Sequence, residues 1–185
     1  MNPPRKTYTV IVAGLSRDLP LFQVAPKLNI AVFNMLGDTE LVQACANALA
    51  EKLAAFDYDL LVTPEAKSIP LAHALSVETK KPYVVLRKFY KPYMGIALMS
   101  ETLSITTGHK QTLYLDEKDQ AQLKGKKVAI LDDVISTGST LQGVQQLMEK
   151  AEAEVVAKAA VFTEGSESDW SGIIALGNLP LFPSA

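Results

Sequence analysis

The segment of residues 126–140, which contains the run KVAILDDVISTGST, restricts the possible folds more than any other part of the chain. Its apolar residues 128–131 include β-branched members, as expected for a strand buried on both faces of a parallel sheet. A hydroxyl-rich turn follows, and beyond it apolar residues recur at helical spacing from Leu141 to Ala151. The segment is therefore predicted to run strand, loop, helix in an α/β fold.

The loop in this segment has the composition of an anion-binding site. Gly138 lets the backbone come close to a ligand, and the start of a helix leaves N–H groups without intrahelical partners. Asp132 and Asp133 would repel a phosphate unless they have other partners. They suit two adjacent sugar hydroxyls, a divalent cation or positive charge on a sugar ring. A phosphorylated ribose meets all of these requirements.

This run resembles the phosphoribosyl diphosphate (PRPP) signature of type I phosphoribosyltransferases, in which two acids and two apolar residues precede a small loop that contains Thr-Gly. The resemblance implies that Asp132 and Asp133 are the catalytic residues and hold the ribose 2′ and 3′ hydroxyls. It also implies that the 5′-phosphate is bound by Ser136, Thr137, Gly138, Ser139 and Thr140. The alternative is an ordinary turn with a solvated acid pair, which the match over a full strand, loop and helix disfavours.

Composition excludes several other classes of protein. The 185 residues favour one domain, residues 1–185, and a formal net charge of −2 shows no basic excess for nucleic acid. Cys45 is the single cysteine, so neither an intrachain disulfide nor a thiolate cluster can form, and its helical spacing from Leu49 predicts a buried thiol. The chain has no apolar run that suits a signal peptide or a membrane span, so we expect a soluble, cytoplasmic protein.

Strand and helix patterns alternate along the chain. Strands are predicted at residues 8–12, 30–33, 59–62, 84–86 and 155–163, and more weakly at 21–24. Asp38 is placed to cap a helix that runs to about Phe56, and a second helix is predicted at residues 71–79.

The turn at residues 64–70 lies between strand 59–62 and helix 71–79, and in a parallel sheet it should open beside the Asp132 turn. Alone, it is at least as well explained as a plain connection. Beside the first motif it resembles the pyrophosphate loop of purine phosphoribosyltransferases, which implies pyrophosphate binding by Glu65, Ala66, Lys67 and Ser68. Lys67 stands in place of the usual arginine and loses the planar fork. Ser68 replaces the usual glycine and makes an unusual backbone conformation harder.

Three cations, Arg87, Lys88 and Lys91, follow strand 84–86. By themselves they indicate a solvated edge. Adenine-type members of the family carry a similar pattern beside the pyrophosphate and partly at a dimer interface. The resemblance therefore implies that the three cations contact diphosphate in a homodimer, where one of them can reach a partner subunit.

Residues 101–116 alternate on either side of a polar tip, which predicts a two-stranded ribbon. Such a ribbon has little apolar surface to hold it, so we expect it to be mobile. The family places a flexible, water-excluding lid here, which implies that Thr106, Thr107, Gly108 and His109 form the lid tip. An exposed loop position explains His109 better than a base or phosphate contact.

The base-binding part of the chain is the least defined. Family members bind the base under a small hood, and residues 1–35 and 166–185 are the candidate segments, although neither has a motif that names a base. Ser136 stands where 6-oxopurine enzymes carry aspartate and adenine enzymes alanine. Adenine is therefore the first choice of substrate, and a 6-oxopurine (xanthine, hypoxanthine or guanine) is the second.

The resemblance covers about residues 38–165 and implies the type I phosphoribosyltransferase fold, with a mostly parallel sheet flanked by helices, a β-ribbon lid and a hood. The implied reaction, a step of purine salvage, transfers 5-phosphoribosyl from PRPP to a purine base and releases pyrophosphate. Mg²⁺ would bind through substrate and water, with Asp132 and Asp133 as further candidate ligands. The alternatives are a PRPP sensor without catalysis and an unrelated nucleotide binder. The sequence lacks both the P-loop and the dinucleotide-binding glycine motifs of the latter.

Overall fold

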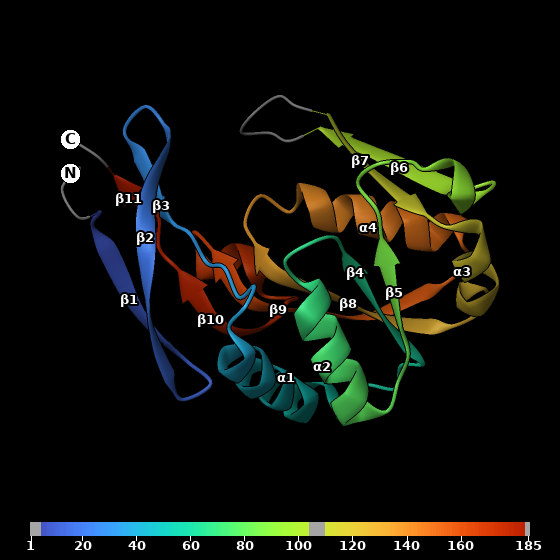
Figure 1. Ribbon diagram of the computed structural model, residues 1–185, viewed down its shortest axis with the longest axis horizontal. Helices are drawn as coiled ribbons and strands as arrows, with labels where there is room; N and C mark the ends of the chain where they lie inside the picture. The colour runs from blue at the N-terminus through green and yellow to red at the C-terminus, as the bar shows by residue number, and fades with distance from the viewer. Residues whose placement is uncertain (1–4, 104–109, 184–185) are drawn as a thin grey trace.

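The computed structural model describes residues 5–103 and 110–183 (Figure 1). Its strands are β1 (Thr7–Val12), β2 (Leu15–Ala25), β3 (Leu28–Ala31), β4 (Leu60–Pro64), β5 (Tyr83–Leu86), β6 (Leu98–Leu103), β7 (Lys110–Leu115), β8 (Lys127–Ile135), β9 (Glu154–Glu164), β10 (Ile174–Leu179) and β11 (Phe182–Pro183). Its helices are α1 (Thr39–Leu53), α2 (Ile69–Thr79), α3 (Glu117–Leu123) and α4 (Ser139–Lys150), with short 3₁₀ turns η1 (Pro92–Met94) and η2 (Glu167–Trp170).

A five-stranded parallel sheet in the order β10-β9-β8-β4-β5 forms the centre of the molecule. Helices α1 and α2 cover one face, and α4 covers the other (Figure 1). The apolar residues 128–131 of β8 are each at most 1% exposed, because helices lie against both faces of this strand. The predicted α/β sheet is confirmed. Among the described residues, no helix has the length and apolar character needed to cross a membrane.

Helix α1 begins as the sequence predicts and ends earlier. The Asp38 carboxylate accepts a hydrogen bond from the Leu41 N–H at 3.1 Å, which caps the helix. The helix ends at Leu53 rather than near Phe56. Cys45 is completely buried in the core, and this burial raises the pKa of its thiol to about 11. The prediction of a buried core thiol is confirmed.

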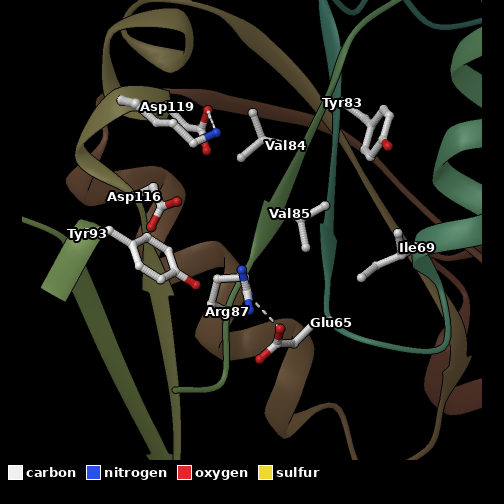
Figure 2. A pocket seen from close by; sticks show the side chains of 10 residues that line it. Glu65, Ile69, Tyr83, Val84, Val85, Arg87, Tyr93, Asp116 and Asp119 are labelled. Carbon is white, nitrogen blue, oxygen red and sulfur yellow. Dashed lines mark hydrogen bonds and ion pairs between the residues drawn. The ribbon is translucent and has the colours of Figure 1, made fainter. Parts of the chain in front are cut away.

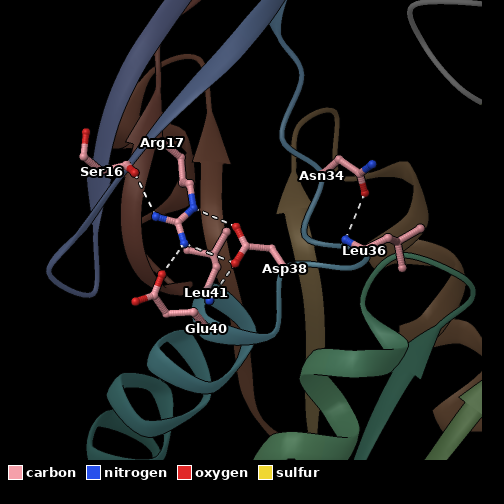
Figure 3. A network of polar contacts seen from close by, with 7 residues as sticks. All are labelled: Ser16, Arg17, Asn34, Leu36, Asp38, Glu40 and Leu41. Atoms are coloured by element: carbon pink, nitrogen blue, oxygen red, sulfur yellow. Dashed lines mark hydrogen bonds and ion pairs between the residues drawn. The ribbon is translucent and has the colours of Figure 1, made fainter.

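Strands β1, β2, β3 and β11 form a separate antiparallel sheet, the hood, at the end of the molecule where both termini lie (Figure 1). Arg17 on β2 connects the hood to α1 (Figure 3). Its guanidinium donates to the Asp38 carboxylate at 2.7 and 3.1 Å and to Glu40 at 2.8 Å. This pairing lowers the pKa of Asp38. The polar network therefore holds the hood beside the first helix of the core.

The C-terminal segment differs from the sequence prediction. In the described part of the candidate hood segment 166–185, which ends at residue 183, only β11 joins the hood, whereas β10 is the edge strand of the central sheet. The interior of β10 contains Gly177, where a β-carbon would lie 2.9 Å from the Phe162 ring. A glycine inside a strand weakens its sequence signal, although here the packing against β9 requires it.

The ribbon of β6 and β7 packs against α4 rather than projecting freely (Figure 1). The Ser100 hydroxyl donates to the Gly143 carbonyl at 2.8 Å, and Leu113 is 1% exposed. The expectation that this ribbon has little apolar surface is therefore wrong for the described strands. The predicted lid tip, Thr106, Thr107, Gly108 and His109, lies outside the described residues.

Candidate functional site

The candidate loops lie at one edge of the central sheet. Strands β5, β4 and β8 are parallel neighbours, so their carboxyl ends meet there. The predicted pyrophosphate loop follows β4, the three cations follow β5, and the predicted phosphate loop follows β8. The structure thus brings together three segments that are far apart in the sequence.

The predicted phosphate loop, residues 136–140, joins β8 to the start of α4. Gly138 has a φ angle of +76° and is the N-cap of α4, where a β-carbon would lie 3.3 Å from the Trp170 ring. The hydroxyls of Thr137 and Ser139 lie 3.0 Å apart. A small hollow is lined by Asp132, Val134, Ile135, Ser136, Thr137, Gly138, Thr140 and Leu141. The N–H groups at the start of α4, which have no partners within the helix, and these hydroxyls can bind a phosphate.

The two adjacent acids differ in their surroundings. Asp132 lines the hollow, and its carboxylate accepts a hydrogen bond from the Asp133 N–H at 2.9 Å. Asp133 is 6% exposed. Burial and the nearby charge of Asp133 raise the pKa of Asp132 well above its usual range, while the Lys67 ammonium opposes this shift. The site therefore favours positive charge or hydrogen-bond donors beside Asp132.

Lys67 links the phosphate loop to the pyrophosphate loop. Its ammonium forms an ion pair with the Asp133 carboxylate at 2.6 Å. It also donates a hydrogen bond to the carbonyl of Phe33 at 3.2 Å, on the connection between hood and core. One cation thus bridges the hood connection, the loop after β4 and the acids of β8.

Glu65 orders the cationic segment that follows β5. Its carboxylate accepts from Arg87 Nε at 2.5 Å and from the Lys88 N–H at 2.6 Å. Figure 2 shows this pair beside Tyr93, and the Glu65 contact raises the pKa of Arg87. The negative charge of Glu65 is therefore neutralised inside the site. Lys88 and Lys91 are exposed, as are Ala66 and Lys67.

Ser68 faces the protein interior. Its hydroxyl donates to the Pro64 carbonyl at 2.9 Å, and the Thr63 hydroxyl lies 2.8 Å from both Ser68 Oγ and the Leu131 carbonyl oxygen. The serine has φ −83° and ψ −6°, a right-handed conformation that any residue adopts. The expected conformational difficulty at Ser68 is therefore absent, and its hydroxyl fixes the loop to the end of β4. The Glu65–Ala66 peptide is cis.

Sequence reasoning did not single out three residues around the loops. Thr63 connects the pyrophosphate loop to β8 through its hydrogen bond to the Leu131 carbonyl. In the sequence, the one sign of this role is a hydroxyl residue at the end of an apolar strand. Trp170 donates its indole N–H to the Glu164 carbonyl at 2.8 Å while its ring covers Gly138. Gln111 accepts from the Thr140 hydroxyl at 3.1 Å, which joins the ribbon to the phosphate loop. These contacts join distant segments, so sequence spacing carries no sign of the last two.

The chemistry of these groups suits a phosphorylated sugar that carries a diphosphate. The site contains an anion-binding loop, an acid pair that can accept from hydroxyls, and cations on two neighbouring loops. In the part of the chain that the structure describes, no three His, Cys, Asp or Glu side chains cluster as metal ligands.

Comparison with known proteins identifies the family of the chain. A sequence model of the phosphoribosyl transferase domain matches residues 34–170. The adenine phosphoribosyltransferase of Thermosipho africanus is 36% identical over 143 residues, which cover 76% of this chain and 80% of the relative. The hypoxanthine/guanine phosphoribosyltransferase of Methanococcus voltae is 40% identical over 107 residues, which cover 58% of this chain and 54% of the relative.

Solved structures agree on the fold. The crystal structure of adenine phosphoribosyltransferase from Thermoanaerobacter pseudethanolicus superposes on this chain with a TM-score of 0.64 and a sequence identity of 23%. The match covers 78% of this chain and 84% of that one. The central parallel sheet, the flanking helices and the hood described above are thus the type I phosphoribosyltransferase fold. By sequence and by fold, the chain belongs to the phosphoribosyltransferase family.

Proposed function

We propose that the protein transfers the 5-phosphoribosyl group of PRPP to a purine base, with adenine as the first choice, in purine salvage. The observation that carries this proposal is the 2.6 Å contact between Lys67 and Asp133. It supports the proposal because Lys67 is the cation that we assign to the diphosphate and Asp133 is an acid that we assign to the ribose. Relatives that are named adenine phosphoribosyltransferase, at 36% and 33% identity, support the choice of base.

The residues suit the charges that develop during the reaction. As pyrophosphate leaves, the anomeric carbon becomes cation-like and the leaving group carries negative charge. Asp132 and Asp133 hold the ribose hydroxyls and favour the positive ring. Lys67, Arg87, Lys88 and Lys91 bind the diphosphate, and Glu65 orients Arg87 through the 2.5 Å contact. The loop of residues 136–140 anchors the 5′-phosphate at the start of α4.

Magnesium fits this site as an ion that binds together with the substrate. Asp132 and Asp133 offer the hard carboxylate oxygens that Mg²⁺ prefers, and Mg²⁺ commonly binds through one or two carboxylates together with substrate phosphates and water. When bound, the metal supplies positive charge that neutralises the departing pyrophosphate. The two acids would hold it directly or through water.

A homodimer is also part of the proposal. Three large apolar side chains next to the cationic segment are strongly exposed: Phe89 (73%), Tyr93 (73%) and Ile96 (80%). Such a patch suits contact with a second copy of the chain. In size-exclusion chromatography with light scattering, the wild type should have the mass of a dimer and Ile96→Glu the mass of a monomer. A monomeric wild type would remove this part of the proposal.

The test of function is incubation of the protein with PRPP, Mg²⁺ and separate purine bases, with detection of pyrophosphate and nucleotide. Adenine should give AMP and pyrophosphate, and Asp133→Asn should lower turnover by a large factor. Product with hypoxanthine or guanine alone would favour the 6-oxopurine reaction, which the relative from Methanococcus voltae supports. PRPP binding without turnover of any base would instead indicate a sensor.

A further inference from the structure

The order of strands along the active edge fixes the direction from which a base must approach. The pyrophosphate-binding segments follow β5 and β4, and the sugar-binding acids lie on β8. A nucleophile that displaces pyrophosphate at the anomeric carbon attacks the face opposite the leaving group. The base therefore enters from the other side of β8, where β9, β10 and the hood lie (Figure 1). This step rests on the proposed function.

Glu164 lies at the carboxyl end of β9 on that side. The register pairs Thr163 with Ile135, the residue before the phosphate loop, and Glu164 with Leu179 of β10. Neighbouring strands are about 5 Å apart, so the Glu164 backbone lies next to the first residue of the loop, Ser136. The Glu164 carbonyl accepts from the Trp170 indole, whose ring lies so near Gly138 that a β-carbon there would be 3.3 Å away.

The Glu164 carboxyl group has the properties of a recognition group. Glu164 is the last residue of β9, and the neighbouring end of β10 at Leu179 carries no ionisable side chain. The next acids along the chain, Glu167 and Asp169, are exposed in η2.

The Glu164 side chain is half-buried, and it shares a face of β9 with Phe162, whose ring packs against Phe33 at a centroid distance of 4.9 Å. The Phe33 carbonyl accepts from Lys67, so this face of β9 leads toward the loop after β4. In agreement, burial raises the pKa of Glu164 and the positive charge of Lys67 lowers it. None of the ion pairs or side-chain hydrogen bonds found within residues 5–103 and 110–183 involves its carboxylate.

We propose that the Glu164 carboxylate accepts a hydrogen bond from the exocyclic amine of the incoming base and thereby selects a 6-aminopurine over a 6-oxopurine. An ionised carboxylate has acceptors and no donor. It can pair with an amine, whereas the carbonyl oxygen of a 6-oxopurine would face it without a shared proton. A partly desolvated acceptor left without a donor is unfavourable, so this contact discriminates through rejection as well as attraction.

The test compares kcat/KM for adenine and hypoxanthine in the wild type, Glu164→Gln and Glu154→Gln. Glutamine keeps the size of the side chain and adds an amide donor that can pair with a carbonyl. The adenine-to-hypoxanthine ratio should fall by about tenfold or more in Glu164→Gln. It should stay unchanged in Glu154→Gln, which alters an exposed residue at the opposite end of the same strand. Glu164→Asp, which keeps the charge, should retain the adenine preference with a higher KM.

Each outcome separates this inference from the proposed function. If the wild type makes AMP and Glu164→Gln keeps the wild-type ratio within about twofold, the base-selecting role is wrong and the transferase function stands. A wild type that prefers hypoxanthine overturns the role in the same way. If circular dichroism shows that Glu164→Gln does not fold, Glu164→Asp tests the role of the carboxylate instead. This variant keeps the charge, so loss of the adenine preference in folded Glu164→Asp contradicts the proposal. No turnover with any purine rejects the transferase function itself.

Discussion

Replacing Asp132 by asparagine should stabilise the ligand-free protein while removing activity. Burial and the charge of Asp133 raise the pKa of Asp132 from 3.8 to about 8. The folded state thus binds the proton more tightly than the unfolded state, so ionisation of this carboxyl costs stability above pH 3.8, increasingly up to about pH 8. Each pKa unit corresponds to about 1.36 kcal/mol, so the ionised Asp132 carboxylate can lower the free energy of unfolding by at most roughly 4 kcal/mol at pH 7.

The measured gain should be smaller, because the Asp132 side chain is partly exposed to solvent. We expect the free energy of unfolding to rise by about 1–2 kcal/mol and Tm by ~3–6 °C at pH 7. Asparagine is nearly isosteric, and its amide oxygen can still accept from the Asp133 N–H. Thermal unfolding of wild type and Asp132→Asn between pH 5 and pH 8 should show a difference that grows with pH.

Asp133→Asn is the matched control, since it removes the ion pair with Lys67 and should give no gain in Tm. A gain of equal size at pH 5 and pH 8 in Asp132→Asn would refute the electrostatic explanation. So would the absence of any gain at pH 8.

Three further substitutions test individual contacts. Lys67→Met should raise the KM for PRPP by about tenfold, because a diphosphate contact is lost. Lys52→Met, on the exposed surface of α1, is the control and should leave the KM unchanged. Equal KM values for the two variants in steady-state kinetics would contradict the role of Lys67. Ser68→Ala should lower the free energy of unfolding by about 1–2 kcal/mol in denaturant titrations, because a buried hydroxyl is lost, and an unchanged midpoint would rule out its anchoring role. Gly138→Ala should weaken PRPP binding by about tenfold in calorimetry, because the positive φ and the Trp170 ring both oppose a β-carbon; wild-type affinity would show that the loop adapts.

The central part of the fold could be predicted because its signals are local. Strand β8 is an apolar run followed by polar loop residues, and Asp38 caps α1 as its position predicts. Strand β10 could not be predicted with the same ease, since Gly177 in its interior is explained only by the Phe162 ring of the adjacent strand. Helix α3 is short, with seven residues, and gave no periodic pattern.

The position of the candidate site could also be predicted, whereas the partners within it could not. The spacing of motifs located the loops after β4, β5 and β8. It gave no sign that Glu65 is paired with Arg87, or that Ser68 points inward to the Pro64 carbonyl. These contacts depend on side-chain directions at the ends of different strands, which a linear pattern does not contain.

The ion pair between Lys67 and Asp133 makes substrate binding an exchange of partners. Without ligand, the ammonium balances an acid that would otherwise face its neighbour with no counter-charge. If PRPP binds as proposed, its hydroxyls and metal take over the acid and release the lysine toward the diphosphate. The empty site would then stay electrically balanced and keep its shape between turnovers. Part of the binding free energy of the substrate would be offset by the cost of separating Lys67 from Asp133.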